Sequence, residues 1–227
     1  NTDNARTRAL RTAIEKSRQT NQNVISLDLL GLELTLRNFE NLQIHYRECL
    51  KIQANENAKF QKYIKNARLY LSHFIQVFNF CIIRGEIKKE VKELYKMGVD
   101  SFTVPDLSTN DLLEYWGDNV IKGEQERLAR GGAPIYNPTI ARVNVAFSQF
   151  KDAYYSQKRF QANTARQLEA LAEQRTDIDK MLTTIWNQIE DYFSGYSNGE
   201  RLQKCKEYGV IYYLRKGEKE KAARENH

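Results

Sequence analysis

Two long stretches of the chain carry apolar residues at the three- and four-residue spacing of an amphipathic helix. Residues 24–83 contain no proline and a single glycine, and residues 139–194 contain neither. Large apolar side chains become sparse near the middle of both stretches, around residues 52–58 and 160–167. Each stretch therefore forms either a hairpin of two helices or one continuous helix. We favour the hairpins, because a single helix of this length is rare in a globular domain.

The pattern predicts an all-α fold, an up-and-down bundle of long antiparallel helices with short capping helices. The alternative is a pair of continuous helices of 55–60 residues that form an antiparallel coiled coil with helical ends. Ser108 or Thr109 is expected to cap a helix that runs to Arg130, and Asn137–Pro138 is expected to start the second long stretch. Two-residue alternation, the sign of a strand, is suggested only by the short run 210–214.

Two similar segments, 85–99 and 199–210, interrupt the helical pattern. Each begins with Gly-Glu, continues through a basic amphipathic run and ends with Gly-Val after a tyrosine. A glycine that stops a long helix, then a short helix, then a second glycine stop would explain both segments. The alternative is that the two segments are similar by chance, because a glycine between helices is common in unrelated helical proteins.

The domain organisation follows from this similarity. We expect one helical domain over residues 1–227. Within it, 24–99 and 138–210 are candidate repeat units of an internal duplication, and 100–137 is their connector.

The net charge of +6 at neutral pH lies at the two ends of the chain. Residues 1–20 hold five basic and two acidic side chains, and residues 200–227 hold eight basic and five acidic. Residues 100–130 hold seven acidic and three basic, so a neutral body contains an acidic middle. The basic ends are either solvated termini or a surface that meets nucleic acid or an acidic partner.

The cysteines and the hydropathy of the chain indicate the cellular compartment in which the protein is expected. The three cysteines lie far apart without a C-x-x-C pair, which indicates a reducing environment rather than disulfides or a zinc site. No secretory signal is visible, although an N-terminus at Asn1 is compatible with trimming, and we expect a cytoplasmic protein. The most apolar run, residues 69–83, is too short and too polar for a membrane span.

The sequence offers no recognisable catalytic, cofactor or metal motif. It lacks the Glu-x-x-His pairs of di-iron bundles, glycine-rich nucleotide loops, and the serine and zinc hydrolase signatures. Closely spaced acidic residues such as Asp177 and Asp179 are expected to be solvated, because they do not face each other on a helix. We therefore expect no catalytic residue, no cofactor and no metal.

The aromatic run 69–83 is apolar on nearly all sides of its predicted helix, so it needs cover on all sides. The segment 102–121 is the preferred cover within the chain. The alternative is an interface with a second chain or a partner helix, and its candidate residues are Tyr70, Phe74, Phe78, Phe80 and Trp116.

The basic ends supply candidate contacts to phosphate groups or to an acidic partner, with tyrosines that could stack on bases. No helix-turn-helix, zinc-finger or RNA-binding signature accompanies them. The candidates are Arg6, Arg8, Arg11, Tyr212, Tyr213, Arg215 and Lys216.

Four short runs are distinctive: VPDLST (104–109), GGAPIYNPTIA (131–141), IWNQIEDYF (185–193) and CKEYGVIYYLRKGEKE (205–220). They resemble a family of uncharacterised all-helical proteins of Bacteroidetes. The resemblance covers most of the chain beyond residue 70 and implies a helical, soluble bacterial protein. It implies no activity, cofactor or catalytic residue.

Together these observations predict a non-enzymatic structural or protein-interaction protein. It would assemble through helical faces, as a homo-oligomer or with another helical protein. The alternative is a nucleic-acid-associated protein that uses its basic termini, and the third hypothesis is an enzyme or cofactor binder without a recognisable motif. No membrane partner is expected.

Overall fold

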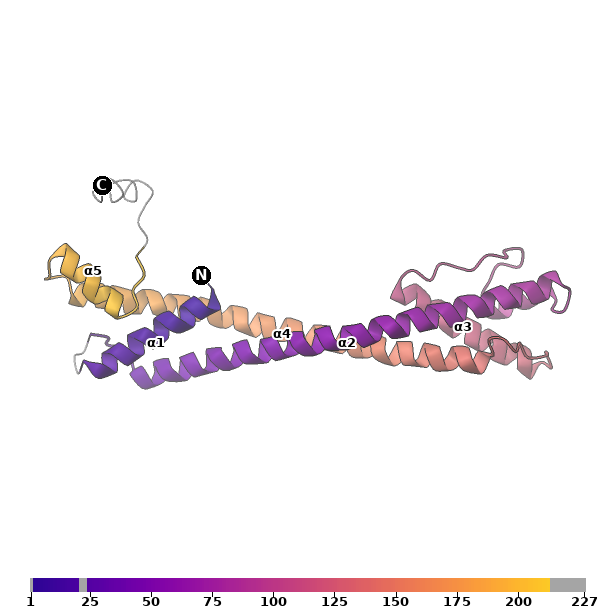
Figure 1. Cartoon of the computed structure of the whole chain (residues 1–227), viewed down its shortest axis with the longest axis horizontal. Helices are drawn as coiled ribbons and strands as arrows, with labels where there is room; N and C mark the ends of the chain where they lie inside the picture. The colour runs from indigo at the N-terminus through magenta and orange to yellow at the C-terminus, as the bar shows by residue number, and fades with distance from the viewer. Residues whose placement is uncertain (1, 21–23, 213–227) are drawn as a thin grey trace, which may run out of the picture. The chain divides into compact units, whose positions relative to one another are not determined.

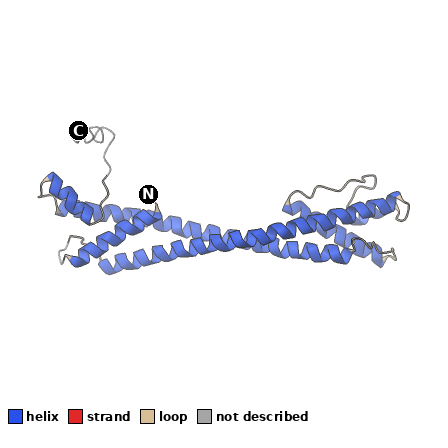
Figure 2. Cartoon of the chain, viewed as in Figure 1, coloured by secondary structure: helices blue, strands red, loops and turns tan. Residues whose placement is uncertain are grey.

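The computed structural model describes residues 2–20 and 24–212, which are helical or lie in turns and loops (Figure 2). These ranges contain no β-strand, so the predicted all-α class is confirmed. In the run 210–214, the first three residues form no strand, and the last two lie outside the described residues.

Two helices are much longer than the others (Figure 1). Helices α2 and α4 are continuous over 55 and 53 residues. The hairpins that we favoured are therefore wrong, and the alternative of two continuous helices is correct. The polar middles of both helices contain alanine and glutamine and no glycine or proline, so nothing local breaks them. Coiled-coil geometry stays a prediction. The elements are α1 (Asp3–Gln19), α2 (Leu29–Ile83), the 3₁₀-helix η1 (Lys89–Tyr95), α3 (Asn110–Ala129), α4 (Ile140–Tyr192) and α5 (Asn198–Glu207).

The chain forms two compact units. Unit 1 consists of Asn1–Glu48 and Ala165–His227, and unit 2 consists of Cys49–Thr164. Each unit combines one end of α2 with the opposite end of α4, so the two helices are antiparallel within each unit. The candidate repeat units 24–99 and 138–210 have other boundaries, and the duplication and the single domain stay predictions.

The core of unit 1 is built by α1, α2, α4 and α5. Ion pairs hold α1 along α4: Arg6 Nη2 lies 2.7 Å from Asp179 Oδ2, and Arg175 Nη2 lies 2.7 Å from Asp3 Oδ2. The hydrogen bond from Arg175 holds the pKa of Asp3 below its ordinary value. The most deeply buried apolar side chains of this core are Leu10, Ala13, Phe39, Leu171, Ile178, Ile185, Ile189 and Cys205.

The core of unit 2 is built by α2, η1, α3 and α4. The rings of Phe60, Phe150 and Tyr154 stack with centroids 5.6–6.2 Å apart. At Gly117 of α3, an added Cβ would overlap the ring of Phe147, so the glycine allows α3 to lie close to α4. The fully buried side chains of this core are Leu71, Phe74, Ile75, Phe78, Tyr95, Leu113, Val120 and Phe150.

The helix starts follow the expected signals in part. Thr109 caps α3 as predicted, because its Oγ1 accepts a first-turn N–H at 3.2 Å. Helix α4 begins at Ile140, so the start expected at Asn137–Pro138 is too early. The hydroxyl of Thr139 accepts a first-turn N–H at 3.3 Å and supplies the cap instead.

The glycine stops are also confirmed only in part. Gly85 follows the end of α2 with φ 77°, and Gly209 follows the end of α5 with φ 87°, a left-handed conformation that favours glycine. However, η1 ends at Tyr95, and the left-handed residue that follows it is Lys96, with φ 58°, rather than Gly98. Gly199 lies inside α5 and stops no helix. The two similar segments are therefore built differently.

Thr109→Ala is expected to lower the free energy of unfolding by about 1 kcal/mol, because it leaves a first-turn N–H of α3 without its acceptor. Urea denaturation measures the change. Thr183→Ala is the matched control, because Thr183 is exposed inside α4 and caps no helix. Equal changes in the two variants would contradict the capping role.

Candidate functional site

The inner side of the aromatic segment is part of the core of unit 2. Phe74 and Phe78 are fully buried, and Tyr70 and Trp116 are half-buried against the same core. Leu107, Leu113 and Val120 of the predicted cover belong to this core as well. Of the five predicted interface residues, Phe80 is the exposed one, at 56 %.

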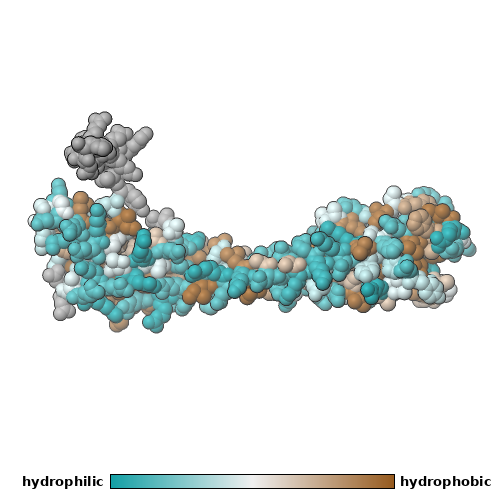
Figure 3. Space-filling model, viewed as in Figure 1, coloured by the Kyte–Doolittle hydropathy of each residue, from teal (hydrophilic) through white to brown (hydrophobic). Residues whose placement is uncertain are grey.

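The outer side of the same segment presents apolar side chains to solvent. Leu69, Phe80 and Ile83 are 61 %, 56 % and 62 % exposed, and His73 and Gln76 are exposed between them. The spacing of these five residues places them on one face of α2, which we call the outer α2 face. Figure 3 shows hydrophobic residues at the surface of unit 2. The face carries no formal charge, because the nearest charged residues of α2 lie beyond it along the chain.

A buried polar cluster lies between η1 and α3. The Arg127 and Glu124 side chains are 6 % and 1 % exposed, and Arg127 Nη2 lies 2.7 Å from Glu124 Oε1. Arg127 Nε donates to Glu124 Oε2 at 2.8 Å and to the Tyr95 hydroxyl at 3.1 Å. The Tyr95 hydroxyl in turn donates to Glu124.

The electrostatics of this cluster follow from burial and pairing. Burial raises the pKa of Tyr95 far above its ordinary value, and the adjacent Glu124 carboxylate adds to the effect. The hydrogen bond to Glu124 raises the pKa of Arg127. Tyr95 therefore stays neutral and Arg127 stays charged at physiological pH, so neither of these two groups exchanges a proton in that range.

The sequence contains a signal for this cluster that net charge alone does not reveal. Leu113, Gly117, Val120, Glu124 and Arg127 follow one another at four- and three-residue spacing. The first three are buried, and Glu124 and Arg127 lie on the same face of α3, so this spacing predicts that the ion pair is buried as well. The charge count of residues 100–130 indicates only an acidic middle of the chain, because a count does not place charges on a helix face.

An apolar groove opens beside the cluster, and we call it the Arg127 groove. It has a volume of about 610 Å³ and lies among the end of α2, η1 and the loop after α3. Its apolar walls include Val77, Ile87, Val91 and Ile135. Burial raises the pKa of the Cys81 thiol, which also lines the groove, so this cysteine is a weak nucleophile.

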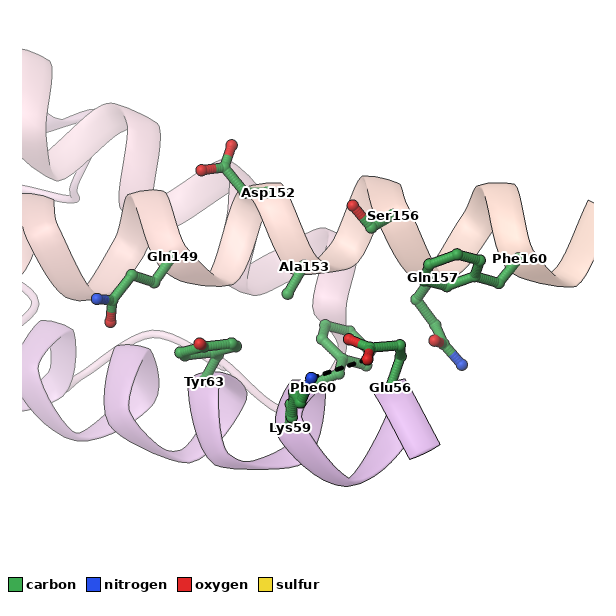
Figure 4. Close-up of a pocket in the computed structure, with 10 residues that line it drawn as sticks. All are labelled: Glu56, Lys59, Phe60, Tyr63, Gln149, Asp152, Ala153, Ser156, Gln157 and Phe160. Atoms are coloured by element: carbon green, nitrogen blue, oxygen red, sulfur yellow. Dashed lines mark hydrogen bonds and ion pairs between the residues drawn. The ribbon is translucent and has the colours of Figure 1, made fainter. Parts of the chain in front are cut away.

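A second cavity, of about 350 Å³, lies between α2 and α4 of unit 2 (Figure 4). Glu56 is paired with Lys59 at 2.8 Å, and Asp152 points away from α2. The two carboxylates therefore do not face each other as an acid–base pair would. Gln157 is buried, and its Oε1 has no hydrogen-bond partner among the described residues, so the cavity offers hydrogen bonding to a polar group or to water.

The structure places four of the seven predicted phosphate contacts in unit 1. Arg6 and Arg11 are each paired with a carboxylate. Arg8 is exposed, and the Tyr212 hydroxyl donates to Glu190 Oε1 at 2.8 Å. The remaining three lie outside the described residues: Tyr213, Arg215 and Lys216.

Metal ligands, membrane spans and relatives add no further site. Within residues 2–20 and 24–212, no three His, Cys, Asp or Glu side chains are grouped so that they could hold a metal ion. None of the helices in the described ranges combines the length and the apolar character that crossing a bilayer requires.

The resemblance to a helical family of Bacteroidetes stays a prediction. Comparisons with family models, with curated proteins and with solved structures find no match for this chain.

Proposed function

We propose that the protein is a non-enzymatic interaction protein that self-associates through the outer α2 face. The observation that carries the proposal is the exposure of Leu69, Phe80 and Ile83 on one uncharged face of a helix whose other side is packed in a core. Apolar side chains grouped in this way are typical of protein-binding surfaces. All three cysteines are free, which supports a reducing, cytoplasmic location.

A second copy of the same chain is the partner that fits this face best. In a twofold dimer the same patch meets itself, so any charge on the patch would approach an identical charge. The outer α2 face lacks charged residues between Arg68 and Arg84, and two copies can therefore meet without burying like charges. His73 and Gln76 can form hydrogen bonds across such an interface.

Leu69→Glu combined with Phe80→Glu is expected to weaken self-association at least about tenfold, because each substitution would bury an unpaired carboxylate in the interface. Sedimentation velocity over a concentration series measures the dissociation constant. Circular dichroism serves as the check that the variant is folded.

The matched control for this experiment is Leu34→Glu, since Leu34 is 59 % exposed on the same helix but belongs to unit 1. We expect the control to associate like the wild type. A wild type that is monomeric at every concentration would overturn the proposal, and so would a control that dissociates as much as the double variant.

The nucleic-acid hypothesis stays a prediction without a supporting observation of its own. Two of its arginines, Arg6 and Arg11, already bind carboxylates within unit 1. Contacts to phosphate would therefore have to compete with these ion pairs.

A further inference from the structure

We infer that the Arg127 groove binds a small amphipathic carboxylate, an apolar chain that ends in one acidic group. This inference does not depend on self-association, because the groove and the outer α2 face are formed by different side chains. The groove volume of about 610 Å³ lies within the range of roughly 300–1,000 Å³ that is usual for small-molecule sites.

The lining of the groove holds hydrogen-bond donors that no described residue uses. Arg127 lines the groove although its side chain is only 6 % exposed. Its Nε and Nη2 donate to the cluster and to the Ala133 carbonyl, the latter at 2.7 Å. Nη1 has no hydrogen-bond partner within residues 2–20 and 24–212, so its two N–H groups remain for an acceptor.

A glycine keeps the space beside this nitrogen open. An added Cβ at Gly132 would lie 2.7 Å from Arg127 Nη1. The φ of Gly132 is not in the left-handed region, so the backbone conformation alone does not call for glycine there. Any larger residue would press on the guanidinium, and the glycine therefore leaves Nη1 accessible from the groove.

The charges around the groove favour one negative group. Glu124 balances Arg127, and Glu86 balances Arg84, whose Nε lies 2.6 Å from Glu86 Oε1. Lys88 also lines the groove and forms no ion pair among the described residues, which leaves one positive charge at the groove. A carboxylate can accept the N–H groups of Arg127 Nη1 and be attracted by Lys88.

The walls select the rest of the ligand. Val77, Ile87, Val91 and Ile135 offer apolar contact and no hydrogen-bonding side chain. A ligand with further polar groups would lose their hydration against these walls without replacement. An unbranched or lightly branched hydrocarbon chain meets this condition.

The test is isothermal titration calorimetry of the full chain with decanoate below its micelle concentration. Methyl decanoate has the same chain without the charge and is the ligand control. We expect saturable binding of one decanoate per chain, and binding of methyl decanoate that is at least about tenfold weaker. Equal affinities, uptake of several molecules per chain, or no saturable heat would each overturn the inference.

Two variants locate the site without touching the buried ion pair. Lys88→Glu should weaken decanoate binding about tenfold. Lys65→Glu reverses the charge of another exposed lysine, which lies on α2 and does not line the groove, and should leave binding unchanged. Val91→Trp should fill the groove and abolish binding, with folding checked by circular dichroism. If Val91→Trp does not fold, the decanoate affinities of Lys88→Glu and Lys65→Glu test the location of the site. Equal affinities of these two variants would overturn the assignment.

Discussion

Arg127→Ala is expected to lower the free energy of unfolding by about 3–5 kcal/mol, because it removes one partner of a buried ion pair. The variant leaves the Glu124 carboxylate, 1 % exposed, without its positive partner inside the core. It also removes one of the hydrogen bonds to the Tyr95 hydroxyl. Chemical denaturation measures the loss as a shift of the midpoint.

Two further variants separate the buried charge from the lost packing. Arg130→Ala removes the partner of Glu126 on the same helix, but that pair is exposed, so we expect little change. Glu124→Gln combined with Arg127→Met removes both charges and keeps an acceptor for Tyr95. This double variant should be more stable than Arg127→Ala. If it is equally unstable, the unpaired carboxylate is not the cause of the loss.

Gly123→Ala is expected to lower the free energy of unfolding by about 1–3 kcal/mol, although alanine favours a helix over glycine by about 1 kcal/mol. An added Cβ would lie 2.8 Å from the Leu94 carbonyl oxygen and 2.9 Å from Tyr95 Cα. These are backbone atoms, so α3 and η1 would have to separate. Urea denaturation measures the loss.

Gly199→Ala is the matched control for this substitution. Gly199 lies within α5, and an added Cβ there would meet nothing within 4 Å. We expect the control to be as stable as the wild type or slightly more stable, because only helix propensity changes. Loss of stability in both variants would show that the close approach of α3 to η1 is not the reason.

The candidate interface illustrates how far the sequence predicts this protein. The apolar character of residues 69–83, and the cover supplied by 102–121, were both readable from helical spacing. Which side of α2 remains exposed was not readable, because nearly every side of that segment is apolar. Packing in the core of unit 2 buries Phe74 and Phe78, the latter against the ring of Tyr95 in η1, and leaves Phe80 exposed.

The sequence predicts less about the Arg127 groove than about the candidate interface. Its walls come from α2, η1 and the loop after α3, which are separated in the chain and joined only by folding. The proximity of Gly132 to the Arg127 guanidinium depends on where α3 ends. No local pattern contains that information.

The sequence by itself predicts the all-α class, the location of the long helices and the helix stops at Gly85 and Gly209. These features depend on the helical period and on local backbone preference. The structure decides between a hairpin and one helix in each long stretch, because the polar middles at 52–58 and 160–167 contain neither a helix breaker nor a buried apolar side chain that would select one of them. Tertiary packing places Glu124 and Arg127 in the core. Their burial depends on η1 and α3 approaching closely at Gly123, and a buried pair is stable only where both charges and the Tyr95 hydroxyl find their partners.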